Sequence, residues 1–195
     1  MTVDYYCALS SPWSYLGHER LGKIAAARKL AIRIHPVNAL AIFDRTGGLP
    51  LPKRSPERQA YRLQELERWR KRLGVALNLK PAHFPADETE AARLVVASRE
   101  AGRDAFGLAG RFMRAVWAEE RNIADPGTIG AIVAEAGQDH AELVKTADSI
   151  DALALRDRDG EAAIARGVFG VPTYVVGDQL FWGQDRLEFV EEVLS

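Results

Sequence analysis

The chain has one cysteine, Cys7, among its 195 residues. Without a second thiol, an intrachain disulfide and any redox cycle that needs two cysteines of one chain are excluded. Lys and Arg number 26 and Asp and Glu 27, so the net charge of −1 gives no overall field that favours nucleic acid or an acidic membrane surface. No apolar run approaches the roughly 20 residues that a membrane-spanning helix needs.

Two further absences concern targeting and metals. The opening stretch MTVDYYCALSS contains an acid at Asp4 and no basic segment, so it lacks the pattern of a secretory signal and we expect a cytoplasmic protein. The four histidines show no spacing typical of a metal site, and we expect no metal. What remains, 47% hydrophobic and 27% charged residues, is typical of a folded globular domain, with or without an insertion.

The first 37 residues predict a strand, a helix and a second strand. Residues 3–9 are rich in β-forming side chains. Ser11 is a natural N-cap, and Pro12 suits the first turn of a helix that runs to about residue 27. Residues 31–37, AIRIHPV, alternate between apolar and polar side chains. A helical crossover of this length predicts that the two strands pair in parallel, with a right-handed connection.

The middle of the chain predicts a loop followed by helices. Residues 38–56 contain a Gly-Gly pair and several prolines, so we expect little regular structure across most of them. From Ser55 onward, about a hundred residues place apolar side chains at helical spacing, with breaks at residues 80–87 and 122–127.

The pattern changes again near the C-terminus. GVPTYVVGDQLFW predicts a hairpin that turns at Gly177-Asp178, and residues 183–195 predict a closing amphipathic helix. We therefore predict an α/β thioredoxin-like fold, formed by residues 1–45 and 167–195, with a loop and an all-helical insertion over residues 46–166. The turn from the first strand into its helix reads SSPWS, and it carries Ser11 and Ser14 where redox proteins of this fold carry cysteines. GVPT, residues 170–173, stands where such proteins hold a cis-proline, so we expect a cis bond before Pro172.

Three segments together resemble one family. SSPWSYL near the N-terminus, LERW after the loop and ARGVFGVPTYVVGDQLFWGQDRLEFV near the C-terminus are similar to the 2-hydroxychromene-2-carboxylate isomerases. That family shares its helix-inserted thioredoxin fold with kappa-class glutathione transferases and DsbA-type oxidoreductases. The resemblance implies a glutathione-dependent isomerase that interconverts 2-hydroxychromene-2-carboxylate and trans-o-hydroxybenzylidenepyruvate in aromatic catabolism. It also implies a homodimer.

The resemblance assigns roles to particular residues. It makes Ser11 the catalytic serine, whose hydroxyl holds the sulfur of glutathione as a thiolate. The residues implied in glutathione binding are Ser11, Val171, Pro172, Trp182, Gly183, Gln184 and Asp185. Those implied in binding the aromatic carboxylate substrate are Lys53, Arg54 and Phe84. Family members commonly carry an acid in a pattern such as F-D-F-x-S-P, whereas this chain has Ala8 at that position.

The residues alone leave other interpretations open. Ser11 can be a helix N-cap only, Asp185 can simply suit the first turn of the last helix, and Lys53 and Arg54 can be solvated loop charges. Two other functions fit the same fold: a kappa-like glutathione transferase or peroxidase, and a non-catalytic module that binds extended peptides along Val171-Pro172. A dithiol oxidant is excluded, because Cys7 has no partner cysteine.

Overall fold

The computed structural model describes residues 2–194, and Met1 and Ser195, the outermost residues of the predicted thioredoxin-like part, lie outside that range. A four-stranded sheet has the order β2-β1-β3-β4. Its strands are β1 (Thr2–Cys7), β2 (Ala31–Pro36), β3 (Thr173–Val176) and β4 (Gln179–Trp182). β1 and β2 are connected by helix α1 (Pro12–Arg28) and pair in parallel. β3 pairs antiparallel with both of its neighbours. The predicted β-α-β unit and the hairpin at Gly177-Asp178 are thus confirmed.

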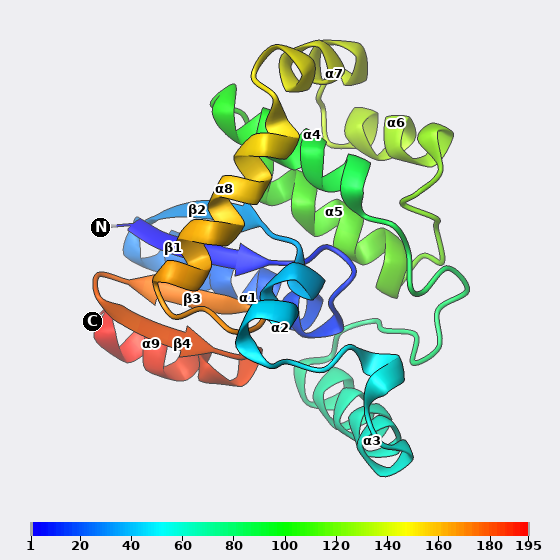
Figure 1. Ribbon diagram of the computed structural model, residues 1–195, viewed down its shortest axis with the longest axis vertical. Coiled ribbons are helices and arrows are strands. Elements are labelled where there is room, and N and C mark those ends of the chain that lie inside the picture. The colour runs from blue at the N-terminus through cyan, green and yellow to red at the C-terminus, as the bar shows by residue number, and fades with distance from the viewer. Residues whose placement is uncertain (1, 195) are drawn as a thin grey trace.

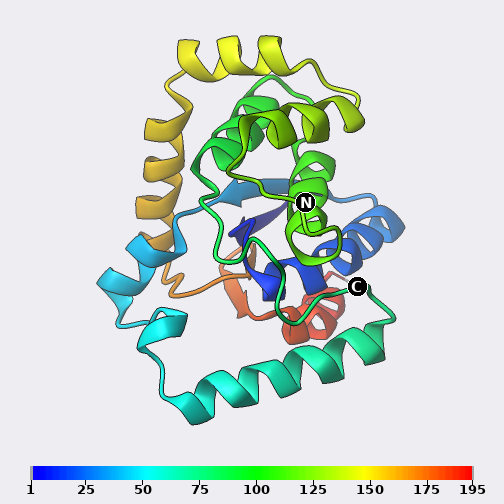
Figure 2. The same ribbon diagram turned by 90° about the vertical axis from the view of Figure 1, so that its right-hand side faces the viewer.

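Helices cover both faces of the sheet (Figures 1 and 2). Successive side chains of a strand point to opposite faces, so Tyr5 packs with α1 and the closing helix α9 (Leu187–Val193), while Tyr6 faces the other way. The second face is covered by α8 (Ala152–Ala165), which crosses it in Figure 1. Tyr5 stacks on Tyr174 of β3 with ring centroids 5.3 Å apart, and both side chains are fully buried.

Six helices form the inserted block that precedes β3. They are α3 (Pro56–Leu73), α4 (Thr89–Glu100), α5 (Ala105–Trp117), α6 (Pro126–Glu135), α7 (His140–Ser149) and α8. The predicted helical block is confirmed, with irregular chain over the predicted break at residues 80–87 and over residues 122–125 of the second one, where α6 begins at Pro126. One continuous hydrophobic cluster contains side chains of β1 and β3 together with Phe112 and Trp117 of α5. The inserted helices therefore pack directly on the sheet rather than forming a separate core.

The prediction of mostly irregular chain over residues 38–56 was wrong for its first half. Helix α2 spans Ala39–Thr46, and a short 3-10 turn follows at Leu51–Lys53. Asn38 caps the helix by accepting hydrogen bonds from the N–H groups of Leu40 and Ala41, and Gly47 ends it in the left-handed conformation. The glycines and prolines that argued against regular structure all lie after residue 46, so they terminate the helix without preventing it.

Two other element boundaries also differ from those predicted. β1 ends at Cys7 rather than residue 9, because the chain turns there and the Ser11 N–H donates to the Ala8 carbonyl oxygen at 3.1 Å. The closing helix begins only at Leu187, after a 3-10 turn over Gln184–Arg186.

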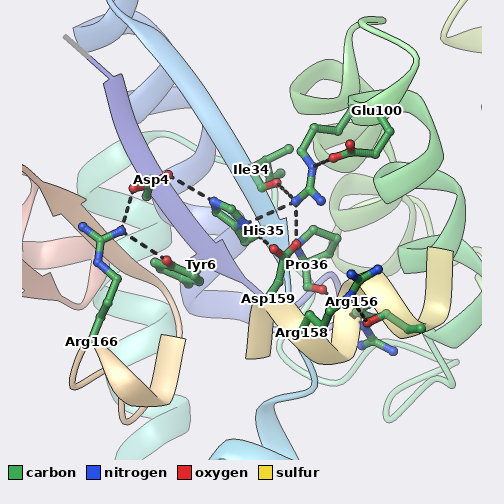
Figure 3. Close-up of polar contacts among 12 residues, drawn as sticks. Asp4, Tyr6, Ile34, His35, Pro36, Glu100, Arg156, Arg158, Asp159 and Arg166 are labelled. Atoms are coloured by element: carbon green, nitrogen blue, oxygen red, sulfur yellow. Dashed lines mark hydrogen bonds and ion pairs between the residues drawn. The ribbon is translucent and has the colours of Figure 1, made fainter. Parts of the chain in front are cut away.

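A buried histidine links the sheet to α8 (Figure 3). His35 Nε2 lies 3.1 Å from an Asp4 oxygen, and its Nδ1 lies 3.2 Å from an Asp159 oxygen. Burial alone would raise the pKa of Asp4 and Asp159. The hydrogen bonds from Arg166 to Asp4 and from Arg99 to Asp159, together with the polar contacts of both carboxylates with His35, instead lower both pKa values. This network fixes α8 against β1 and β2.

A second buried histidine, His18 of α1, lies against α5. Its Nε2 lies 3.1 Å from the Phe106 carbonyl oxygen, and its ring stacks on the Phe106 ring with centroids 3.9 Å apart. Nδ1 is buried and has no hydrogen-bond partner among the described residues. Since a proton on Nδ1 would find no acceptor, burial lowers the pKa of His18 to about 4.

We expect His18 to destabilise the protein in mild acid. The unfolded imidazole gains a proton near its usual pKa of about 6.5, while the folded one stays neutral until about pH 4. The free energy of unfolding should therefore fall as the pH drops, by about 2 kcal/mol between pH 7 and pH 5 from this residue. Urea unfolding at both pH values measures it. His18→Gln should lose that part of the pH dependence, and His83→Gln, at an exposed site, should keep it. If the free energy of unfolding depended on pH equally in His18→Gln and in wild type, the assignment to His18 would be contradicted.

Candidate active site at the start of helix α1

Ser11 occupies the N-cap of α1. Its backbone is extended, and its hydroxyl oxygen accepts from the Ser14 N–H at 3.3 Å. The predicted cap is therefore confirmed. A capping hydroxyl uses a lone pair, so its own hydrogen stays available for donation. The first turn of α1 contains no acid, and the positive end of this 17-residue helix is not neutralised there.

The strand register brings the proline loop to the same end of the sheet. Tyr6 of β1 is opposite Thr173 of β3, and continuing that register places Val171 beside Ala8, three residues before Ser11. The Val171–Pro172 peptide bond is cis, as predicted. Among the described residues, neither the N–H nor the C=O of Val171 has a hydrogen-bond partner, so both are free to pair with an extended ligand.

The WGQD run continues from β4 at that end of the sheet. Trp182 is half exposed and packs against Phe169, with ring centroids 4.8 Å apart, and the Gly183 N–H donates to the Pro172 carbonyl oxygen at 2.9 Å. A Cβ on Gly170 would come within 2.6 Å of Trp182 Nε1, so only glycine lets the indole lie this close to the loop.

The two polar residues of the run differ in exposure. Gln184 is buried. Its backbone carbonyl oxygen and its side-chain amide oxygen each accept a hydrogen bond from Arg20 of α1, at 3.1 Å. Asp185 is exposed and pairs with Arg186 at 3.0 Å. Gln184 therefore anchors the run to α1, and Asp185 is the member of this pair whose carboxylate faces solvent. Their roles toward glutathione stay predictions.

A buried carboxylate that no sequence pattern indicated lies beside the serine turn. Glu88, which immediately precedes α4, accepts from the Ser10 N–H at 2.6 Å and from the Ser10 hydroxyl at 2.7 Å. Its other oxygen pairs with Arg156 of α8 at 3.1 Å, and Arg156 also donates to the Pro36 carbonyl oxygen at 3.2 Å. Burial raises the pKa of Glu88, an effect that the Ser10 hydrogen bonds and the Arg156 charge oppose. This chain thus has a carboxylate at the turn although Ala8 replaces the family's usual acid.

The predicted substrate residues lie on two different segments. Lys53 is exposed at the 3-10 turn, and Arg54 donates from Nε to the Leu49 carbonyl oxygen at 2.8 Å. Phe84 lies in the irregular segment between α3 and α4, where its ring centroid is 4.9 Å from that of the fully buried Trp117.

Cys7 and Ser14 both lie in the interior of the fold. Cys7 is buried, and burial raises the pKa of its thiol well above the usual range, so the thiol is inert at neutral pH. Ser14 is buried as well. A surface groove of about 540 Å³ between α1 and α5 includes none of the predicted site residues.

Two features are absent from residues 2–194. No three His, Cys, Asp or Glu side chains in that range are close enough together to hold a metal ion. In the same range, no helix combines the length and apolar character needed to cross a membrane.

Comparison with known proteins identifies the family of this chain. The family model of the DSBA-like thioredoxin domain matches residues 2–195. A 2-hydroxychromene-2-carboxylate isomerase from Pseudomonas putida is 32% identical over 200 residues, covering 100% of this chain and 95% of the relative. Glutathione S-transferase kappa 1 from Homo sapiens is 26% identical over 212 residues, covering 100% of this chain and 91% of the relative. A solved 2-hydroxychromene-2-carboxylate isomerase superposes with a TM-score of 0.78 at 28% identity, covering 100% of this chain and 94% of that one.

The helix-inserted sheet and the family match define a DsbA-like thioredoxin-fold protein. Within that class the chain belongs to the 2-hydroxychromene-2-carboxylate isomerase family and is an enzyme of the isomerase type. The predicted fold class and family are both confirmed.

Proposed function

We propose that this enzyme uses glutathione to interconvert 2-hydroxychromene-2-carboxylate and trans-o-hydroxybenzylidenepyruvate. The observation that carries the proposal is the Ser11 hydroxyl, which caps α1 with its lone pair and keeps its hydrogen for a ligand at the helix N-terminus. The names of its relatives, isomerases and a kappa glutathione transferase, support the same reaction class and cofactor. A cytoplasmic location and a homodimer stay predictions from the sequence.

The residues at this end of the sheet fit glutathione. The unpaired N–H and C=O of Val171 suit the backbone of a short extended peptide. The exposed carboxylate of Asp185 suits the α-ammonium group at the γ-glutamyl end. Ser11 can donate to the sulfur, and the positive end of α1 favours its anionic form.

When bound, glutathione would supply a thiolate that adds reversibly to the conjugated double bond of the substrate. The C–O bond of the cyclic hemiketal would break, with the hemiketal hydroxyl proton passing to the phenol oxygen, so that the former double bond could rotate before the thiolate leaves and the double bond re-forms. The protein's part is to keep the thiol ionised and the partners aligned. Ser11 holds the anionic sulfur through its O–H donor. The Glu88 carboxylate fixes the turn through Ser10, so that the Ser11 hydroxyl and the start of α1 keep a constant position. No cysteine of the chain is required, and there is no net redox change.

The ultraviolet spectrum of 2-hydroxychromene-2-carboxylate with purified protein tests the proposal. We expect rapid approach to equilibrium only when glutathione is present, with all glutathione recovered as free thiol afterwards. Stoichiometric loss of the thiol would instead indicate a kappa-like transferase. Peptide binding without turnover would indicate a binding module. Isomerisation at an unchanged rate in the absence of any thiol would contradict the proposed role of glutathione.

A further inference from the structure

Arg62, in the second turn of α3, is a partly buried arginine without an acidic partner. Its guanidinium carbon lies 5.5 Å from the ring centroid of Phe84 and 5.9 Å from that of Trp117. Within residues 2–194 it makes neither an ion pair nor a hydrogen bond. Other arginines of the same helix do have partners, since Arg68 pairs with Glu65 and Arg70 with Glu67.

Holding an unpaired guanidinium in this position costs free energy. Burial lowers the pKa of Arg62 to about 10, and the charge of Arg54 adds to the effect. Attraction to the ring faces compensates only in part, and it leaves the N–H donors of the guanidinium unused. An anion that accepted from these donors would complete the site, and a carboxylate matches their fork geometry.

The surroundings of Arg62 favour an anion attached to an aromatic ring. Phe84 and Trp117 present two rings beside the cation, tilted at 48° to each other. Trp117 is fully buried, and its Nε1–H has no partner among the described residues. A planar aromatic carboxylate can contact the partly exposed ring of Phe84, which packs on the buried Trp117, while its carboxylate reaches Arg62.

The same segment connects Arg62 to the serine turn. Phe84 precedes Glu88 by four residues, a span of at most about 14 Å, and Glu88 accepts from the backbone and side chain of Ser10. The cation, the two rings and Ser11 therefore lie in one region of the molecule. Arg54, predicted to bind substrate, contributes a second positive charge close enough to affect Arg62.

We infer that Arg62 binds the carboxylate of an aromatic carboxylate substrate, against the ring of Phe84, and so determines which substrates the enzyme accepts. This inference rests on the proposed function for its physiological ligand. It differs from the sequence prediction, which assigned the carboxylate to Lys53 and Arg54. Lys53 is exposed, so water and salt screen its charge more strongly than that of Arg62.

Cinnamate, an aromatic conjugated carboxylate, and its uncharged amide, cinnamamide, test the site without glutathione. Titration followed by the ¹⁵N signal of the Trp117 indole should show at least about tenfold tighter binding of cinnamate. Arg62→Gln should weaken cinnamate binding about 10- to 100-fold and leave cinnamamide nearly unchanged. Arg62→Lys keeps the positive charge but not the planar pair of N–H donors, so its affinity for cinnamate should lie between those of wild type and Arg62→Gln. This variant tests the site if Arg62→Gln does not fold.

Arg72→Gln is the matched control. Arg72 lies on the same helix over another aromatic ring, 5.5 Å from the centroid of Trp69, but its side chain is exposed. This variant should bind cinnamate like wild type. Equal affinity of wild type for cinnamate and cinnamamide, or an unchanged cinnamate affinity in Arg62→Gln, would overturn the inference. Failure of glutathione-dependent turnover with cinnamate discrimination intact would contradict the proposed function and leave the carboxylate site standing.

Discussion

Replacing Ser11 by alanine is expected to slow the glutathione-dependent reaction about 10- to 100-fold, while the free energy of unfolding falls by only about 1 kcal/mol. The large effect follows from losing a hydrogen bond to a charged sulfur, and the small one from losing the cap on the Ser14 N–H. Because the thiol would then ionise less readily, the variant should recover part of its rate at higher pH. Initial rates from pH 6 to 9, with urea unfolding in parallel, measure both effects.

Ser55→Ala separates the two roles of a capping serine. Ser55 caps α3 as Ser11 caps α1, with a proline next in the chain and a hydrogen bond accepted from the Arg58 N–H at 3.4 Å. This variant should lose a comparable free energy of unfolding and keep the wild-type rate. Ser11→Thr, which retains a hydroxyl, should keep much of the activity. If Ser11→Ala and Ser55→Ala had equal rates, Ser11 would be a cap and nothing more.

The second large effect is expected at the buried pair beneath the turn. Glu88→Ala should lower the free energy of unfolding by about 3–5 kcal/mol, because it leaves the buried Arg156 charge without an acidic partner and removes the acceptor of the Ser10 N–H. The side chains of Glu88 and Arg156 are only 12% and 7% exposed, so water cannot replace the lost contacts. Urea unfolding followed by circular dichroism measures the change.

A double-mutant cycle shows whether the cost comes from the unpaired charge. Glu88→Gln combined with Arg156→Met removes both charges, and we expect it to be less destabilising than the sum of the single changes. Glu90→Ala on the adjoining first turn of α4 removes an exposed acid from Arg93, which keeps Asp148 as a partner, and should cost less than about 1 kcal/mol. Additive effects of Glu88→Gln and Arg156→Met would show that the two residues act independently.

The first turn of α1 is a feature that the local sequence predicts correctly. Ser11 followed by Pro12 predicts the cap and the helix start, because both depend on backbone groups within three residues. The hairpin at Gly177-Asp178 follows in the same way from turn chemistry. The prediction for residues 38–46 was wrong because the glycines and prolines that follow them indicate a loop, whereas Asn38 is a good N-cap and allows a helix to form before the first glycine.

The site itself depends on contacts that no local pattern contains. Glu88 meets Ser10 across 78 residues, and nothing in its own neighbourhood distinguishes a carboxylate that will be buried from one that will be solvated. Arg62 likewise resembles the other arginines of a strongly charged helix until the fold brings Phe84 and Trp117 against it and places no acid within reach. The sequence determined the order of elements, the helix caps and the serine that replaces a thiol, because these depend on neighbouring residues. The tertiary structure alone decided which charges are buried and which lack partners, because burial is set by segments that approach only in the folded chain.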